Sequence, residues 1–406
     1  MGSDKAKILL VWGYHRKGWI EPFEKLKKDF DFVYLDHLER ADEEQSLVDL
    51  PRYYWMDYKS PYQLLDDIQP DRVIFMSITR SNAMALNQAC RHRRIKTYIL
   101  QHGILHPFSF YLENNQKEMS HLREQGKKWQ SALNKKQQWH FLFFLLRAMR
   151  WNNLNPYFFF LRFLIGKKVH GENLQLLLKS LASEATRPHK YLVFTKENAG
   201  LFKERDGAKD SDFIELGNPF LDDFFQEPAQ DIGQYYLLID EPLAYMNDPN
   251  AEGFFKQEEV IEFQRKLNDF ARSKGKKLYI KLHPYSYGND FYLQDENIVH
   301  FEDADTPKLI REASGIFGST STLLIPAIFL NKCILFKIWD FSEFAADSQQ
   351  WGLVQSLDFH RFSKEDINFE AFEKRKEQLQ LMIDKYMYRI DGKAIERLKE
   401  ALQHAD

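Results

Sequence analysis

The residues with the clearest chemical potential form the run Lys281-Leu282-His283-Pro284, which ends the apolar stretch Lys277–Lys281. Pro284 fixes its own φ and disfavours helix at the residue before it, so we expect the strand to end with His283 turned into a crevice. The ammonium of Lys281 is a point charge and the imidazole is a donor, and both suit phosphate oxygens. The alternative is a histidine that only satisfies backbone groups in a turn.

A second polar run reads Gly318-Ser319-Thr320-Ser321-Thr322 and lies between an expected strand, Gly315–Phe317, and an expected helix, Thr322–Leu330. Glycine permits a tight turn, the hydroxyls can cap the helix, and its free N–H groups suit an anion. An ordinary helix cap needs only one hydroxyl, and four stand here in a row. The sequence therefore favours a phosphate site over a plain cap.

Short apolar runs alternate with helical patterns along most of the chain, which indicates βαβ units and parallel sheets. We expect an α/β fold with two Rossmann-like domains that face each other across a cleft. In such sheets, ligands bind at the carboxyl ends of the strands. The domains expected are 1–228, with a helical insertion at about 108–188, then 229–375, then C-terminal helices at 376–406. The expected strands are Lys7–Trp12, Phe32–Leu35, Arg72–Met76, Lys96–Leu100, Tyr191–Phe194, Phe213–Leu216, Tyr235–Ile239, Lys277–Lys281, Ile298–Phe301, Gly315–Phe317 and Cys333–Phe336.

The order and spacing of these motifs resemble the bacterial GT-B-fold transferases that use cytidine nucleotides. These are the sialyl- and polysialyltransferases, the Kdo transferases and the CDP-glycerol polymer synthases. In that family the histidine of the His-Pro motif and a Ser/Thr pair hold the donor's phosphates, which implies this role for His283, with Lys281 and Pro284, and for Ser319 to Thr322. The stretches Val193–Phe202 and Glu215–Asp223 resemble the end of the family's N-terminal half.

The resemblance implies a glycosyltransferase that moves a sugar from a nucleotide donor, with CMP-linked sialic acid or Kdo expected, onto a saccharide or lipid-linked acceptor of a bacterial surface glycan. It implies no metal and no cofactor. The alternatives are a CDP-glycerol-type polyol-phosphate transferase, a UDP-sugar transferase, or a non-catalytic protein that binds glycans or nucleotides on the same scaffold.

The general base of the sialyltransferase pattern is not found in this chain. That pattern has two acids followed by glycine, whereas here Asp240-Glu241 is followed by Pro242. We therefore expect these two acids to be helix-capping or loop carboxylates.

A base is then expected from the N-terminal half, and histidine has a suitable pKa for proton transfer near neutral pH. His102 is the first candidate, because it ends an expected strand beside Gly103, and His15 is the second. The alternative for His102 is a structural donor that orients a loop. Residues expected to contact an anionic acceptor are Gly13, Arg16, Lys17 and Gln101, although a cluster of this kind is commonly a solvated turn.

The segment Arg123–Lys168 is basic and rich in aromatic residues. Ten basic residues stand against one acid, which gives the segment a charge of +9 in a chain of net charge −3. Its apolar blocks, Trp139–Trp151 and Tyr157–Lys168, are each shorter than the 20 or so residues that span a bilayer. Such runs suit peripheral contact with an anionic membrane, and the alternative is an insertion that packs its phenylalanines into the core.

Several other functions are excluded or disfavoured by the sequence. The chain lacks a Walker-type phosphate loop, a G-x-G-x-x-G after the first strand and a G-x-S-x-G elbow, and no His/Cys pair has zinc-ligand spacing. The near-neutral charge favours no nucleic-acid partner. Two cysteines cannot form a disulfide framework, so we expect a cytoplasmic protein at the inner face of the membrane.

Overall fold

The computed structural model describes residues 5–42, 46–109, 135–148, 165, 179, 186–226, 233–241, 243, 256–283, 286–288, 292–319, 321–338, 343–370 and 376–404. No helix within these ranges is both long enough and apolar enough to cross a membrane. The chain divides into two compact units. The first comprises Met1–Phe220, Lys385–Arg389 and Lys393–Asp406, and the second comprises Leu221–Asp384 and Ile390–Gly392.

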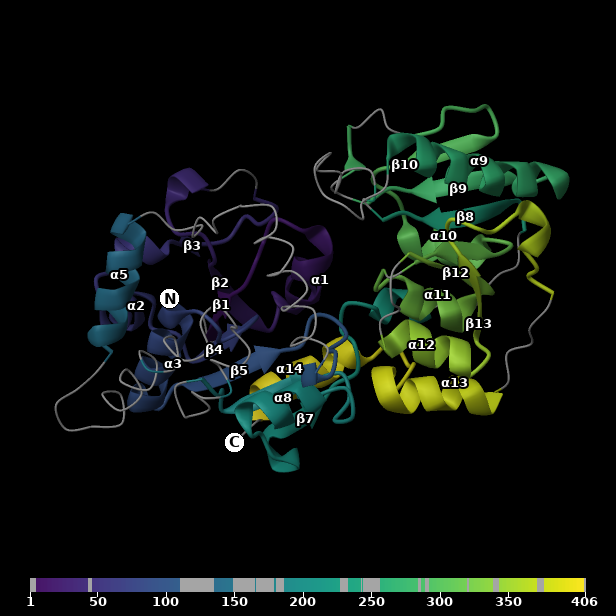
Figure 1. Ribbon diagram of the computed structural model, residues 1–406. Helices are drawn as coiled ribbons and strands as arrows, with labels where there is room; N and C mark the ends of the chain where they lie inside the picture. The colour runs from purple at the N-terminus through teal and green to yellow at the C-terminus, as the bar shows by residue number, and fades with distance from the viewer. Residues whose placement is uncertain are drawn as a thin grey trace. The chain divides into compact units, whose positions relative to one another are not determined.

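The first unit is built on a seven-stranded parallel sheet of order β3-β2-β1-β4-β5-β6-β7 (Figure 1). The strand order reverses direction between β1 and β4, and a doubly wound sheet has its ligand crevice at this switch point. The strands are β1 (Ala6–Val11), β2 (Phe30–Leu35), β3 (Arg52–Tyr53), β4 (Arg72–Phe75), β5 (Lys96–Leu100), β6 (Lys190–Val193) and β7 (Phe213–Glu215).

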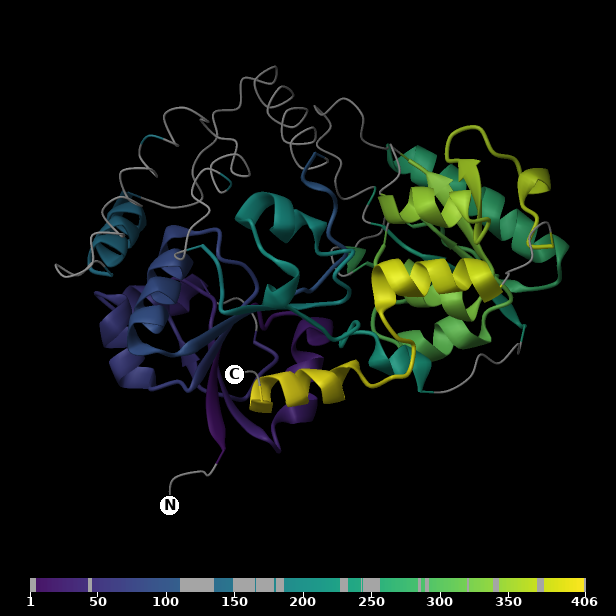
Figure 2. The ribbon, with the colours of Figure 1, turned by 90° about the horizontal axis from the view of Figure 1, so that it is seen from below.

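Helices cover both faces of this sheet, because successive strand residues point to opposite sides. Leu9 of β1 packs in one core with α2, α3, α5 and α8, while Ile8 and Leu10 pack in another core with α1 and α14. Figure 2 shows the last helix, α14, beside α1, so the end of the chain belongs to the first unit. The helices are α1 (Lys17–Leu26), α2 (Pro61–Ile68), α3 (Ser81–Arg93), α5 (Lys135–Leu146), α8 (Gly200–Asp206) and α14 (Ala394–His404).

The second unit has a six-stranded parallel sheet of order β10-β9-β8-β11-β12-β13. Its order repeats that of the first sheet, and its switch point lies between β8 and β11. All five residues of β8 are buried, as expected for a central strand covered on both faces. The strands are β8 (Tyr235–Ile239), β9 (Lys277–Lys281), β10 (Ile298–Phe301), β11 (Ile316–Gly318), β12 (Cys333–Lys337) and β13 (Val354–Asp358).

Helix α9 (Gln257–Ser273) packs an amphipathic stripe against one face of this sheet, with Val260, Phe263, Leu267 and Phe270 buried in its core. The remaining helices are α10 (Thr306–Glu312), α11 (Leu324–Leu330), α12 (Glu343–Gln350) and α13 (Lys376–Met382), and a π-turn follows at Ile383–Met387.

The predicted fold class, α/β with two Rossmann-like domains, is confirmed. The first segment of the first unit ends at Phe220, while the expected boundary at 228/229 falls among residues 227–232, outside the described residues, and stays a prediction. Most of the expected insertion at about 108–188 also lies outside them, as do Pro284 and Thr320. Among the described residues of the basic aromatic segment, α5 is a helix.

Candidate functional site

The switch point of the second sheet is flanked by two polar residues, Asp240 directly after β8 and Ser319 directly after β11. Both are buried, with exposed fractions of 7% and 4%, and both line the same hollow. His283 follows β9, the other neighbour of β8, and its backbone N–H donates to Asp240 Oδ2 over 3.2 Å. Asp240 therefore holds the histidine loop and shares its hollow with Ser319, the start of the hydroxyl run.

Asp240 organises the loop that follows β9. Besides the His283 N–H, its Oδ2 accepts hydrogen bonds from the hydroxyls of Ser286 (3.0 Å) and Tyr292 (2.8 Å). Burial raises the pKa of Asp240 to about 6, although the donated hydrogen bonds, first that of Tyr292, act in the opposite direction. Of the two expected roles, helix-capping or loop carboxylate, Asp240 has the second: it lies in the loop after β8, where it is buried and accepts three hydrogen bonds from the loop after β9.

A small hollow lies beside Asp240 and Ser319, and its empty space, with open solvent at its mouth included, is about 330 Å³. Its polar side chains are Asp240, Glu241 and Ser319 at the strand ends and Gln264 of α9, and most of the other lining residues are apolar. The lining residues are Leu238, Ile239, Asp240, Glu241, Leu243, Val260, Phe263, Gln264, Gly318, Ser319, Phe336, Ile338 and Phe359.

The turn after β11 depends on close packing. A Cβ on Gly318 would lie 2.6 Å from Leu324 Cδ2, so the strand end approaches α11 as only glycine allows. Helix α11 begins at Leu324 and not at Thr322 as expected. Its cap residue, Leu323, donates its N–H to Ser321 Oγ over 3.4 Å, while Thr322 is exposed. The Ser321 hydroxyl thus accepts a hydrogen bond within the turn, and Ser319 lines the hollow.

Lys281 does not present a free ammonium group. Its Nζ donates to the carbonyl oxygens of Leu282 (3.0 Å) and Glu302 (2.7 Å) and to the hydroxyl of Tyr287 (3.1 Å). Burial lowers its pKa, and the carboxylates of Asp303, Asp240 and Glu302 offset part of that shift. A direct role in donor binding stays a prediction, and these contacts show Lys281 tying β9 to the loop after β10.

His102 lies at the carboxyl end of β5, as expected. The residue is exposed, and its ring packs edge-on against Trp12 (5.7 Å between ring centroids) and Trp19 (6.3 Å). The protein around the ring desolvates it and lowers its pKa, opposed by a hydrogen bond with the Leu100 backbone. A neutral imidazole at pH 7 is the form that accepts a proton.

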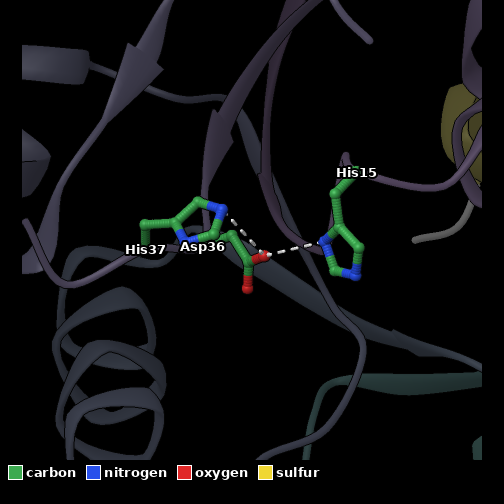
Figure 3. A group of neighbouring side chains, drawn as sticks. All are labelled: His15, Asp36 and His37. Carbon is green, nitrogen blue, oxygen red and sulfur yellow. Dashed lines mark ion pairs between the residues drawn. The ribbon is translucent and has the colours of Figure 1, made fainter. Parts of the chain in front are cut away.

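His15, the second candidate, is drawn in Figure 3 with two residues that sequence reasoning missed, Asp36 and His37. Its Nδ1 lies 4.0 Å from Asp36 Oδ2, and His37 Nε2 lies 4.0 Å from the same oxygen. Burial lowers the pKa of His15, Asp36 raises it, and Arg16 and His37 lower it further. Because His15 also packs against Trp19 (5.4 Å), both candidate histidines border one indole ring.

The four expected acceptor-contacting residues differ in their surroundings. Gly13 is buried, and a Cβ there would lie 3.0 Å from the Trp19 ring. The Arg16 guanidinium stacks over the same ring at 4.6 Å, and Lys17 is exposed.

Gln101 is buried, and its amide is engaged inside the unit. Its Nε2 donates to Asn198 Oδ1 and to the Gly103 carbonyl, and its Oε1 accepts from the N–H of Phe194. Gln101 therefore shapes the loop that carries His102. Its contact with an acceptor stays a prediction.

No protein-family model and no curated protein matches this chain. Solved structures do. The wall teichoic acid polymerase TagF matches with 11% identity and a TM-score of 0.53, over 99% of this chain and 89% of that one. CalG4, the calicheamicin glycosyltransferase, matches with 12% identity and a TM-score of 0.52, over 99% and 98%. A UDP-N-acetylglucosamine 2-epimerase from Rickettsia bellii matches with 12% identity and a TM-score of 0.50, over 99% and 97%.

These similarities extend over nearly the whole chain, and at such low identity they establish the fold alone. The chain has a GT-B-like fold of two Rossmann-like domains. Transferases and an epimerase stand among the proteins with this fold, so the function has to be argued from the site.

Proposed function

We propose that this protein is a glycosyltransferase that moves a sugar from a cytidine-nucleotide donor, a CMP-linked acidic sugar such as sialic acid or Kdo, to a saccharide acceptor of a surface glycan. The observation that carries the proposal is the crevice at the carboxyl ends of β8, β9 and β11. There Asp240 anchors the His283 loop and lines one hollow with Ser319.

In this proposal the second unit holds the donor. The nucleobase packs at the mouth of the hollow, and Glu241, one of the residues that line it, accepts hydrogen bonds from the ribose hydroxyls. His283 and the hydroxyls of Ser319 to Thr322 donate to the phosphate oxygens. These donors are worth most when negative charge builds up on the departing phosphate, so they lower the barrier and not only the Kd.

The first unit supplies the base that takes the proton of the acceptor hydroxyl. His102 fits best, because the residue is exposed at the carboxyl end of β5 and its lowered pKa keeps the imidazole neutral near pH 7. His15 is the second candidate for this role.

A nucleotide-release assay with CMP-, CDP- and UDP-linked donors, each with a saccharide acceptor, tests the proposal. We expect acceptor-dependent release of CMP, reduced in His283→Ala through the Kd and in His102→Ala through kcat. Release from CDP-glycerol instead would select polyol-phosphate transfer, a second candidate that the likeness to a wall teichoic acid polymerase favours. No release from any donor would contradict the enzymatic proposal.

We further propose that α5 rests on the anionic inner face of the cytoplasmic membrane. Its inner side is anchored by Phe141, Phe144 and Leu145, which are buried in the core. Its outer face carries Lys136, Trp139, Phe143 and Arg147 at helical spacing. Trp139 and Phe143 are 59% and 47% exposed and stack on each other, an aromatic pair between two cations that suits a lipid headgroup layer.

A further inference from the structure

Two neighbouring loops of the first unit bring two imidazoles and one carboxylate together. His15 follows β1, and Asp36 and His37 follow β2, which pairs with β1 in parallel. The possible ligand atoms of the three side chains all lie within 4.8 Å of one another. Figure 3 shows His15 Nδ1 and His37 Nε2 both directed at one oxygen of Asp36.

The spacing in this group is wrong for direct hydrogen bonds. Each imidazole nitrogen lies 4.0 Å from Asp36 Oδ2, whereas such bonds are about 2.7–3.2 Å long. His37 Nε2 is moreover buried without a hydrogen-bond partner among the described residues. A buried nitrogen that faces a carboxylate across a gap is an unsatisfied polar group, and a bound cation would satisfy it.

We propose that His15, Asp36 and His37 form a binding site for a borderline divalent cation of the Zn²⁺ type, with a fourth position open to water or an anionic oxygen. Zn–N and Zn–O bonds of about 2.0–2.2 Å in a tetrahedron set ligand atoms about 3.4 Å apart, so the two 4.0 Å gaps to Asp36 need a small closure, and the two imidazole nitrogens, which lie within 4.8 Å of each other, must come equally close. Two imidazoles with one carboxylate select such an ion over Mg²⁺ and Ca²⁺, which prefer all-oxygen sites.

Neighbouring residues hold His37 in place, whereas His15 is exposed and can adjust its position. The His37 carbonyl accepts from the N–H of Trp55, and its ring packs edge-on against the buried ring of Tyr14 at 5.3 Å. His15 is exposed, so its ring can rotate toward the ion. Arg16 is the nearby positive charge that opposes cation binding, and its guanidinium is occupied by stacking over Trp19.

The site goes beyond the proposed transfer reaction and also bears on the choice of base. An ion bound to Nδ1 of His15 takes that lone pair, and Nε2 then carries the remaining proton. The ring can no longer accept a proton, which leaves His102 as the base whenever the site is filled.

Metal titration of the full chain, without a tag and after treatment with a chelator, tests the site. Calorimetry with ZnCl₂ should give one ion per chain with a Kd of about 1 μM or lower, and MgCl₂ should give no comparable binding. Asp36→Asn, His37→Asn and His15→Asn should each weaken Zn²⁺ binding at least about 100-fold. The visible spectrum of Co²⁺ should change on binding to the wild type and not in these variants.

His360→Asn is the matched control, because His360 Nδ1 also lies 4.0 Å from a carboxylate, that of Glu259, at an exposed position. Its Zn²⁺ affinity should equal that of the wild type. His15 is exposed too, so His15→Asn is informative even if the other two variants unfold. Absence of saturable Zn²⁺ binding to the wild type, or equal affinity in His15→Asn, would overturn the proposal.

Discussion

The two sheets share one strand order over their first six strands, but the polar side chains at the carboxyl ends of their strands differ in how they are hydrogen-bonded. In the second unit, three donors converge on Asp240 within 3.2 Å, and Asp240 itself lines a defined hollow together with Ser319. In the first unit, His15 and His37 stay 4.0 Å from Asp36, and His102 is exposed beside two indoles. A preorganised edge is suited to recognising one constant ligand, and an edge with open, titratable groups is suited to proton transfer or to metal binding.

The largest expected effect is on kcat, when the proposed base of the first unit is removed. His102→Ala should lower kcat by about 10²–10⁴-fold and leave the Kd for CMP unchanged, because general-base catalysis contributes only in the transition state. Steady-state kinetics and calorimetry would measure the two quantities, with His92→Ala on α3 as the control. If His102→Ala keeps full kcat while His15→Ala loses it, the base is His15 and the assignment is wrong.

The buried Asp240 carboxyl should make the stability of the second unit depend on pH. Its pKa of about 6 lies above the ordinary value of 3.8, so the folded state favours the protonated acid. Its contribution is therefore fully present below pH 4 and is lost as the pH rises through 6. Relative to Asp240→Asn, the wild type should lose roughly 2 kcal/mol of unfolding free energy between pH 4 and pH 7, at 1.36 kcal/mol for each pKa unit, because the carboxyl is already partly ionised in the unfolded chain at pH 4.

Urea unfolding across this pH range would measure the difference. Asp36→Asn in the first unit is the control, since that carboxylate is one-third exposed. A flat difference between the wild type and Asp240→Asn would mean that the carboxylate is not desolvated.

Alanine substitution of one glycine in each unit compares how tightly the loops after β11 and β5 are packed. Gly318→Ala should destabilise the protein by about 2 kcal/mol, because the new Cβ would lie 2.6 Å from a buried Leu324 methyl group. Gly103→Ala has open space around its Cβ and should change stability by less than about 0.5 kcal/mol. Equal thermal midpoints for the two variants would contradict the tight turn after β11.

The smallest effect is expected at the surface. Lys136→Gln on α5 should weaken binding to anionic vesicles by about 1 kcal/mol, or roughly fivefold, and should not affect neutral vesicles. Lys277→Gln, at an exposed lysine of the second unit, should have no effect in the same sedimentation assay. Equal weakening by both variants would indicate a general charge effect and not an α5 surface.

Much of the fold follows from sequence patterns. Lys96–Leu100, Tyr235–Ile239 and Lys277–Lys281 were predicted as strands with the bounds they have in the structure, because continuous apolar runs bounded by turn residues are typical of buried parallel strands. The edge strands β3 and β13 were missed. They are short or half exposed, and so they lack that apolar signal.

The site was predictable only where one loop carries its own signal. The His-Pro and Ser/Thr runs stand out because each is contiguous in the sequence. Asp240 was expected as a helix-capping or loop carboxylate, and its hydrogen bonds could not be predicted because their donors lie on another loop. The His15 group was missed because the pairing of β1 with β2 assembles it. A search for polar residues directly after neighbouring strands would have found both.

Calorimetric binding of CMP to the full chain tests the central claim most directly, namely that the β8–β9–β11 crevice holds the nucleotide. The account predicts saturable binding of one CMP, weakened at least about tenfold in His283→Ala and in Ser319→Ala and unchanged in His102→Ala. Equal CMP affinity in all four proteins, or none in the wild type, would contradict it.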